Sequence, residues 1–310
     1  MGRRGDGGCA HVPARRARNP CPQAHRWRTT LSAGPPSDGP ALPPALPERM
    51  TASMSDPFRI PDDDPSLTRR ILRFELPMKP RDVWAALPTV LRGPRGLIAL
   101  HRPVAEPDPM LVLYEFESCP FCRRVREVLN ELDLPYESRP CARGGRFRKE
   151  LVERSGREMV PYLVDEASSV SLHESADIIA HLWERWGGRE RPRLARLLSP
   201  LETLSAFAGS GVRPLGRAVN RRVADRPTPE HPLELWNIEA SPYCRRVRET
   251  LCTLDLPCRV YNIAKKSRLR PTFRERYGRV QVPLLHDPNT NTTLIESSDI
   301  IAYLKRTYGP

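Results

Sequence analysis

The sequence has no long hydrophobic run and little lysine. No stretch of its 310 residues approaches the ~18–20 apolar residues of a membrane-spanning helix, so we expect no transmembrane segment. Only 5 of its 50 basic residues are lysine. The net charge of +13 does not lie along one stripe interleaved with aromatic residues, and residues 111–187 carry a net charge of −3. We therefore do not expect a nucleic-acid-binding protein.

The cysteines lack the regular spacing of a disulfide framework. There are eight in the chain, and no second C-x-x-C or H-x₃₋₅-H motif follows Cys119 and Cys122 at zinc-finger spacing. We expect a reduced compartment, a few functional thiols and no metal. Two alternatives to a redox pair stay open. One is a metal site with Cys141 as third ligand, and the other is a pair of small buried thiols.

Proline is abundant, with 35 residues, and the excess is expected in tails and linkers. Residues 1–49 are rich in Pro, Gly, Ala and Arg without apolar periodicity, and we predict a disordered tail over 1–65. Translation starting at Met50 or Met54 is one explanation of this stretch, and a transit peptide is the other. We expect a cytoplasmic protein, or a plastid or other organellar one if 1–49 is a transit peptide.

An internal repeat organises the rest of the chain. A shift of 122 residues aligns 111–187 with 233–309 without a gap, and 35 of the 77 pairs are identical. This predicts two modules, 111–187 and 233–310, formed by duplication. Before them, 66–110 is predicted as an ordered lead-in with a short helix around Val83–Leu91. Between them, 188–232 is predicted as a helical connector with an apolar stretch around Leu194–Phe207.

Each copy has the pattern βαβ, α, ββ, α. In the first copy strands are expected at 111–116, near Tyr136, at 160–164 and near 170–172, and helices at about 120–131, 147–154 and 175–186. The first crossover implies two parallel strands, and the ββ pair implies a hairpin. We therefore predict an α/β fold in which each module has a small mixed sheet with helices on both faces.

The thiol motif Ser118-Cys119-Pro120-Phe121-Cys122 lies between a predicted strand and a predicted helix. Cys119 would lie at the helix N-terminus, where free N–H groups and the helix dipole lower the pKa of a thiol. Arg123 and Arg124 are expected to add positive potential. Cys122, one turn further on, is placed to resolve a mixed disulfide.

The second copy has Ser241 where the first has Cys119, so it cannot form the same disulfide. Ser241 keeps a hydroxyl that could donate a hydrogen bond to a bound thiolate. Cys244 aligns with Cys122, and we expect it to be buried and structural rather than reactive.

Two further pairs of residues recur in both copies. Val160-Pro161 and Val282-Pro283 open a strand, where a cis X-Pro bond would expose backbone groups to an extended peptide. Each copy also has a Glu-Ser pair where a strand turns into a helix, a position suited to binding a carboxylate and an ammonium group or to simple helix capping. These pairs are Glu174-Ser175 and Glu296-Ser297.

In this order the three motifs resemble the thioredoxin-like N-terminal domain of the glutathione transferase superfamily, especially its glutaredoxin-like and omega-like members. The resemblance covers about 154 residues and implies two tandem thioredoxin-like domains. It implies that Cys119 is the redox cysteine and that Ser241 resembles the serine that holds a glutathione thiolate. For glutathione it implies backbone pairing at Val160 and Val282, beside cis Pro161 and Pro283, and γ-glutamyl binding by Glu174, Ser175, Glu296 and Ser297.

The chain departs from a complete transferase because 188–232 is too short for an all-helical second domain. We therefore expect a glutaredoxin-like, glutathione-dependent thiol–disulfide oxidoreductase that acts on protein disulfides or glutathionylated proteins. The alternatives are a glutathione transferase that uses Ser241, and a non-enzymatic scaffold that binds glutathione or a partner. The scaffold hypothesis predicts a large exposed apolar surface on the connector helix. A homodimer is left open.

Overall fold

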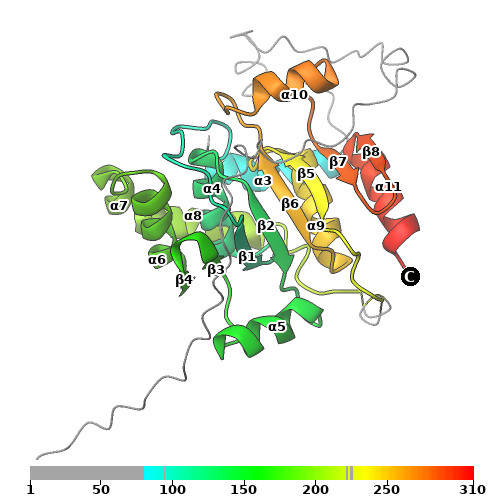
Figure 1. Cartoon of the computed structure of the whole chain (residues 1–310), viewed down its shortest axis with the longest axis horizontal. Coiled ribbons are helices and arrows are strands. Elements are labelled where there is room, and N and C mark those ends of the chain that lie inside the picture. The colour runs from blue at the N-terminus through cyan, green and yellow to red at the C-terminus, as the bar shows by residue number, and fades with distance from the viewer. Residues whose placement is uncertain (1–79, 94, 221–222, 224–225) are drawn as a thin grey trace, which may run out of the picture. The chain divides into compact units, whose positions relative to one another are not determined.

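The two copies of the repeat fold alike, and together they build one sheet (Figure 1). The computed structural model describes residues 80–93, 95–220, 223 and 226–310, all within one compact unit. The predicted tail, 1–65, and the first part of the lead-in, 66–79, lie outside the described residues.

The first module follows the predicted order of strands and helices. Its elements are β1 (Leu111–Glu115), α4 (Pro120–Glu131), β2 (Tyr136–Pro140), α5 (Arg146–Ser155), β3 (Tyr162–Asp165), a 3₁₀ turn (Glu166–Ser168), β4 (Val170–His173) and α6 (Ser175–His181). The helix expected over 175–186 is α-helical only as far as His181, and Leu182–Trp186 continue it as a π-helical turn. Gly156 ends α5 in the left-handed conformation, as its sequence position indicates.

The second module repeats this order at the same offset. Its elements are β5 (Leu233–Asn237), α9 (Pro242–Thr253), β6 (Cys258–Asn262), α10 (Arg270–Tyr277), β7 (Leu284–Asp287), β8 (Thr292–Ile295) and α11 (Ser297–Tyr308). In both modules a proline is the first residue of the helix that follows the thiol motif, where its missing N–H leaves no helical hydrogen bond unmade. The predicted α/β fold with two thioredoxin-like modules is thus confirmed.

The sequence had led us to expect a separate small sheet in each module. The two modules do not have separate sheets. They share one eight-stranded sheet in the order β4-β3-β1-β2-β6-β5-β7-β8. The edge strands β2 and β6 pair antiparallel, with Tyr136 opposite Val260 and Ser138 opposite Cys258. An unpaired strand edge presents free N–H and C=O groups, and this pairing satisfies the edge of each module with that of the other.

The core follows from this shared sheet. One apolar cluster contains residues of both modules and lies between the sheet and the helices on one face, with Leu113, Leu129, Leu235 and Leu251 among its members. A smaller cluster in the first module includes Tyr114, from the opposite side of β1, together with residues of α5. Side chains alternate along a strand, so β1 contributes to both cores.

The lead-in and the connector are structurally equivalent, which the 122-residue alignment does not show. The lead-in forms α3 (Pro80–Arg92), and the connector forms α7 (Arg193–Leu197) and α8 (Ser199–Gly211). A glycine with positive φ follows each long helix, Gly96 at 76° and Gly216 at 75°. A short extended arm comes next and pairs with a module, Ile98 with Lys265 and Ala218 with Arg143. The arm that precedes each module in the sequence therefore pairs with the other module.

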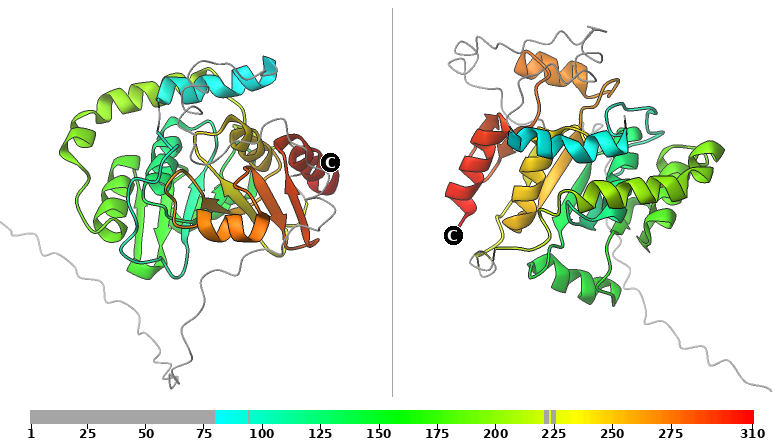
Figure 2. Two further views of the ribbon diagram at one scale, coloured as in Figure 1. Left: turned by 90° about the horizontal axis from the view of Figure 1, so that it is seen from above. Right: turned by 180° about the vertical axis from the view of Figure 1, so that it is seen from behind.

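The helices α3 and α8 pack against each other on the outer side of α4 and α9, the two helices that begin at Pro120 and Pro242 (Figure 2). Helix α8 contacts α4, and α3 contacts α9. Helix α8 turns Glu202, Ala206, Gly209 and Ser210 inward. The large apolar side chains of this layer are exposed instead: Val83, Trp84, Leu87, Val90 and Leu91 of α3, Leu194 and Leu197 of α7, and Leu201, Leu204 and Phe207 of α8. We call these ten residues the apolar outer face. Its residues on α7 and α8 lie in the connector, where the scaffold hypothesis predicts an exposed apolar surface.

No helix among the described residues is both long enough and apolar enough to cross a membrane.

Candidate thiol site

Cys119 caps the N-terminus of α4. Its Sγ accepts a hydrogen bond from the backbone N–H of Cys122 at 3.4 Å, and its own N–H donates to the carbonyl oxygen of Phe116 at 3.1 Å. The free N–H groups of the first helical turn and the helix dipole favour a negative charge at this position. Both cysteines are buried, with side chains 4% and 0% exposed respectively, and both are free thiols.

The two thiols of the motif differ in pKa. A hydrogen bond from the Cys122 side chain lowers the pKa of Cys119 most, burial opposes this, and the N–H groups of Cys122 and Phe121 and the charge of Arg126 lower it further. Burial raises the pKa of Cys122 well above its ordinary value, and the hydrogen bond to Cys119 adds to the rise. A thiolate is therefore favoured at Cys119 rather than at Cys122, whose side chain donates the hydrogen bond that stabilises it.

The charge of Arg126 lowers the pKa of Cys119, whereas the sequence had suggested Arg123 and Arg124 as the source of positive potential. Arg124 turns toward the neighbouring helices and donates hydrogen bonds to the hydroxyls of Ser175, at 3.4 Å, and Ser199, at 2.8 Å. Burial lowers the pKa of Arg123, whose Nε and Nη1 have no hydrogen-bond partner among the described residues. Arg126, three residues after Arg123 on the same face of α4, reaches Glu239 of the second module, whereas Arg124 lies on a different face.

The second module keeps the geometry of the motif with different chemistry. Ser241 caps α9, and its Oγ accepts a hydrogen bond from the N–H of Cys244 at 3.3 Å. Cys244 is fully buried, and burial raises the pKa of its thiol. As expected, this cysteine is buried, and Ser241 lies where Cys119 lies in the first module.

Both predicted Val-Pro pairs have cis peptide bonds, and so does Asp108-Pro109. Pro161 and Pro283 are buried, each immediately before its strand, β3 or β7. Val160 packs against the small core of the first module and remains half-buried.

The Glu-Ser pairs lie at the N-termini of α6 and α11. Glu174 and Glu296 are exposed and adopt positive φ angles of 67° and 70°, which cost energy for residues other than glycine. Ser175 and Ser297 are buried behind them. Arg124 reaches Ser175 in one module, and Arg246 reaches Ser297 in the other, each at 3.4 Å, so the thiol helix and the Glu-Ser pair are in contact in both modules.

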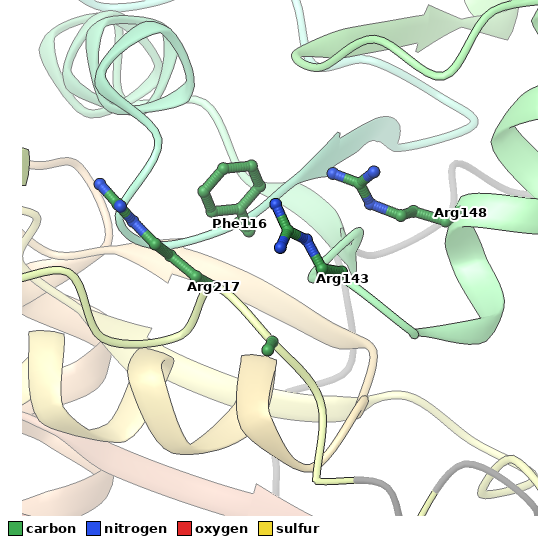
Figure 3. Close-up of a pocket in the computed structure, with 5 residues that line it drawn as sticks. Phe116, Arg143, Arg148 and Arg217 are labelled. Carbon is green, nitrogen blue, oxygen red and sulfur yellow. The ribbon is translucent and has the colours of Figure 1, made fainter.

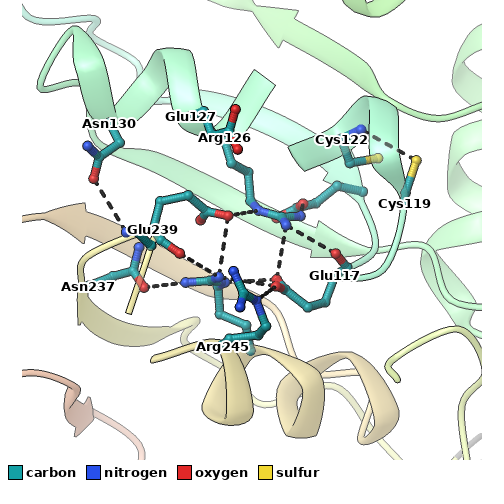
Figure 4. Close-up of polar contacts among 12 residues, drawn as sticks. Glu117, Cys119, Cys122, Arg126, Glu127, Asn130, Asn237, Glu239 and Arg245 are labelled. Atoms are coloured by element: carbon teal, nitrogen blue, oxygen red, sulfur yellow. Dashed lines mark hydrogen bonds and ion pairs between the residues drawn. The ribbon is translucent and has the colours of Figure 1, made fainter. Parts of the chain in front are cut away.

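A buried ionic network joins the two thiol loops across the module interface (Figure 4). Glu117 lies two residues before Cys119 and accepts hydrogen bonds from Arg248 at 2.8 and 3.1 Å. Glu239 lies two residues before Ser241 and accepts a hydrogen bond from Arg126 at 3.1 Å. Arg126 also pairs with Glu115, and Arg248 also donates to Asn237 at 2.6 Å. The network has approximate twofold symmetry, because its principal residues differ by 122 in number.

The roles of these charged residues could not be predicted from the sequence. Charged side chains on a helix are usually solvated, and nothing local marks these as buried. A signal was nevertheless present, since Glu117, Arg123 and Arg126 are identical to their counterparts in the second copy. Among the described residues no group of three or more His, Cys, Asp or Glu side chains is arranged to hold a metal ion.

Comparison with known proteins supports the predicted family of both modules. The family model of the glutathione S-transferase N-terminal domain matches residues 113–190 and 235–310. Glutaredoxin 3 of Escherichia coli, strain K12, is 29% identical over 58 residues, which are 19% of this chain and 70% of the glutaredoxin. Glutaredoxin 3 of strain O157:H7 matches equally. The trimeric glutathione transferase TDR1 of Leishmania, a solved structure, is 18% identical, with 64% of this chain and 68% of that chain covered and a TM-score of 0.23.

These matches define the class of the protein as thioredoxin-like and glutaredoxin-like. More specifically, it is a protein with two glutathione S-transferase N-terminal domains in tandem, one in each module. Its relatives place it at family level among glutathione-related thiol oxidoreductases and transferases.

Proposed function

We propose that the first module is a glutathione-dependent thiol–disulfide oxidoreductase in which Cys119 is the nucleophile. One observation carries the proposal. Of the six cysteines among the described residues, Cys119 alone has a lowered pKa, and it alone caps a helix. Burial raises the pKa of the other five, Cys122, Cys141, Cys244, Cys252 and Cys258.

The reaction is thiol–disulfide exchange. The Cys119 thiolate attacks one sulfur of a substrate disulfide, forms a mixed disulfide with it and releases the other sulfur as a thiolate. Cys122 then loses its proton and attacks Sγ of Cys119, which releases the substrate as a thiol and leaves a Cys119–Cys122 disulfide. Two molecules of glutathione reduce this disulfide and become glutathione disulfide. When the mixed disulfide is with glutathione, a second glutathione can resolve it directly.

Glutathione is proposed to bind along the line from Cys119 to Ser175. Its cysteinyl backbone would pair with Val160, beside cis Pro161, and its γ-glutamyl group would bind at Glu174 and Ser175. The strained φ of Glu174 supports this placement, because strained residues persist where the surrounding structure holds them for a function. By the same argument Val282, Pro283, Glu296 and Ser297 would form a glutathione site in the second module.

The test is the pH dependence of Cys119 alkylation in the full chain, with modified cysteines identified by peptide mapping and Cys119→Ser as the control. We expect a pKa well below the ~8.5 of a free thiol, and reduction of a glutathionylated peptide that is lost in Cys119→Ser. A pKa at or above 8.5, or reductase activity that survives in Cys119→Ser, would overturn the proposal.

Two specific observations support other candidates. Ser241 occupies the capping position with its hydroxyl hydrogen-bonded to the N–H of Cys244, which suits a transferase that activates glutathione in the second module. That function predicts conjugation activity that survives Cys119→Ser and is lost in Ser241→Ala. The apolar outer face supports a partner-binding scaffold, which predicts binding that is independent of Cys119.

A further inference from the structure

The apolar outer face has no part in the proposed thiol chemistry. The hollow that adjoins the thiol loop is formed by other residues: its volume is about 350 Å³, and it is lined by Phe116, Arg143, Arg148, Arg217 and Ala218 (Figure 3). Phe116 joins it to the thiol loop, because its carbonyl oxygen accepts a hydrogen bond from the N–H of Cys119. No residue of the outer face lines this hollow or belongs to a motif predicted to bind glutathione.

Helices α3 and α8 expose no charged side chain among their described residues. Every exposed residue of the two helices is apolar. Their described charged residues turn inward: the Nε of Arg92 donates to Glu127 at 2.8 Å, and Glu202 accepts a hydrogen bond from Arg191 at 2.6 Å. A continuous apolar surface of this kind marks a place where a protein contacts another protein or a membrane.

The two helices form a fixed base for the outer face. They run in opposite directions, because Trp84 near the start of α3 meets the end of α8, and Arg92 at the end of α3 meets its start. The indole N–H of Trp84 donates to the carbonyl oxygen of Val212 at 2.8 Å, and Arg92 donates to the carbonyl oxygen of Glu202. The exposed apolar side chains therefore project from a layer of two paired helices (Figure 2).

Arginines accompany the most exposed part of this face. Leu197 of α7 is the most exposed of its ten residues, at 77%, and Leu194 is 67% exposed. Arg193 and Arg196 lie beside them in the sequence and are exposed too. Arg196 pairs with Glu190 at 3.0 Å, and Arg193 has no ion pair with any described residue. Residues 188–220 contain six arginines and two glutamates, so the connector adds positive charge beside the apolar surface.

We propose that the apolar outer face docks on a membrane surface that contains anionic lipids. Leucine and aromatic side chains enter the boundary between headgroups and acyl chains, and arginines at the edge of such a face interact with anionic headgroups. The leucines of α7 and α8, Trp84 and the arginines of α7 supply these groups. The net charge of +13 adds a long-range attraction to an anionic surface.

A membrane fits the charge of this protein better than a second copy of the chain does. Two copies would bring together two molecules that each carry a net charge of +13, and like charge opposes association. A lipid surface also adapts to the protruding side chains of Leu194 and Leu197, whereas a protein interface requires a matching shape.

Docking brings the thiol motif to the edge of the membrane-bound surface. Phe121 lies between Cys119 and Cys122 in the sequence and is 39% exposed. Its ring packs edge to face on that of Phe207, a residue of the outer face, with the centroids 5.3 Å apart. The outer face and the thiol motif are thus adjacent, and docking itself does not depend on the thiol reaction.

The experiment measures co-sedimentation of the full chain with lipid vesicles. One set of vesicles contains phosphatidylcholine alone, and the other contains phosphatidylcholine with phosphatidylserine. We expect binding to the vesicles with phosphatidylserine, which weakens as the salt concentration rises. Binding to phosphatidylcholine alone should be weaker by at least about fivefold.

Variants locate the bound surface. Leu197→Glu and Leu204→Glu should each weaken binding at least about tenfold, because each replaces an inserted apolar side chain by a charged one. Both positions are exposed in the free protein, so both variants are expected to fold. Val152→Glu adds the same charge at an exposed position of α5 and should bind as the unmodified protein does. Arg193→Gln should weaken binding to phosphatidylserine vesicles about fivefold, and Arg154→Gln, at an exposed arginine of α5, should leave it unchanged.

Three results would overturn the inference. One is the absence of binding to vesicles with phosphatidylserine, and another is binding that persists unchanged in Leu197→Glu and Leu204→Glu. The third is a dimer in solution, measured by light scattering, that Leu204→Glu dissociates, because this would assign the face to a second copy. Cys119→Ser separates this inference from the proposed function, because it abolishes the thiol reaction and should leave vesicle binding unchanged.

Discussion

Glu117 of the first module accepts two hydrogen bonds from Arg248 of the second, at 2.8 and 3.1 Å. Burial alone would raise the pKa of Glu117, but the charges of Arg126 and Arg248 lower it below its ordinary value. Because Glu117 lies two residues before Cys119, the second module helps to hold the loop that carries this cysteine. The reciprocal contact, from Arg126 to Glu239, holds the loop that carries Ser241.

Breaking this pair should destabilise the whole protein. Arg248→Met leaves the buried carboxylate of Glu117 without its main partner, and we expect a loss of about 3–5 kcal/mol in the free energy of unfolding. Arg154→Met is the control, because it removes an exposed ion pair with Glu166 and should cost less than about 1 kcal/mol. Urea unfolding measures both. Equal losses in the two variants would contradict a structural role for the buried pair.

The hydrogen bond between the two thiols should control the pKa of Cys119. Cys122→Ala removes the side-chain donor that lowers this pKa most, so the pKa should rise and alkylation at neutral pH should slow. Cys122→Ser keeps a donor and should shift the pKa less. Alkylation rates measured between pH 5 and 9 test both. A pKa that is the same in Cys122→Ala as in the unmodified protein would contradict the prediction.

Glu131 should make stability fall as the pH rises. Burial raises the pKa of this carboxyl to about 7, although Arg95, at 3.5 Å, opposes the rise. Since an unfolded Glu has a pKa of about 4.3, the folded state binds the extra proton between about pH 4.3 and 7, and stability declines through that window.

Glu131→Gln should remove this decline, which is at most about 4 kcal/mol, and should be more stable than the unmodified protein at pH 8. Urea unfolding at pH 5 and pH 8 measures the difference for each protein. The same loss of stability in both would show that another group is responsible.

Gly216 should be intolerant of a side chain. Its φ is 75°, and an added Cβ would lie 3.3 Å from the Cβ atoms of Glu117 and Cys252. We expect Gly216→Ala to cost about 1–2 kcal/mol. The control, Gly211→Ala at the end of α8, meets no atom within 4 Å and should be neutral or stabilising. Thermal unfolding of both variants checks which one is less stable. A Gly216→Ala protein as stable as Gly211→Ala would contradict the prediction.

Helix α8 should tolerate a polar substitution at an exposed position and should lose stability when a larger side chain is introduced at a buried one. Leu204 is 68% exposed, and Leu204→Gln should change stability by less than about 0.5 kcal/mol. Ala206 is fully buried, and Ala206→Leu should cost about 1–3 kcal/mol through overpacking. Chemical denaturation distinguishes them. A large loss in Leu204→Gln would show that its side chain is buried in the protein in solution.

The sequence predicted the fold well where its signals are local. The 122-residue repeat, the proline after Cys119 and the glycine after α5 define modules and helix ends, because each acts through the backbone of its neighbours. The positions of Cys119 and Ser241 at equivalent helix N-termini follow from the same signals.

The contacts between the modules could not be predicted in this way. Strands β2 and β6 share no identical aligned residue, and an edge that pairs with another strand looks in sequence like one that faces solvent. The lead-in and connector arms are structurally equivalent, but beyond Gly96 and Gly216 their sequences have little similarity that would reveal it. The surroundings of Arg217 could not be predicted either, because the hollow that it lines forms only when the connector arm pairs with Arg143.

The pairing of β2 with β6 places Glu137 opposite Arg259, and these two residues occupy the same position of the repeat. In a symmetric pair of identical chains, the residue at such a point faces its own copy, so a glutamate would face a glutamate. Joining both copies in one polypeptide removes that restriction. The halves can then differ in charge across their common axis, and they are always present in equal numbers.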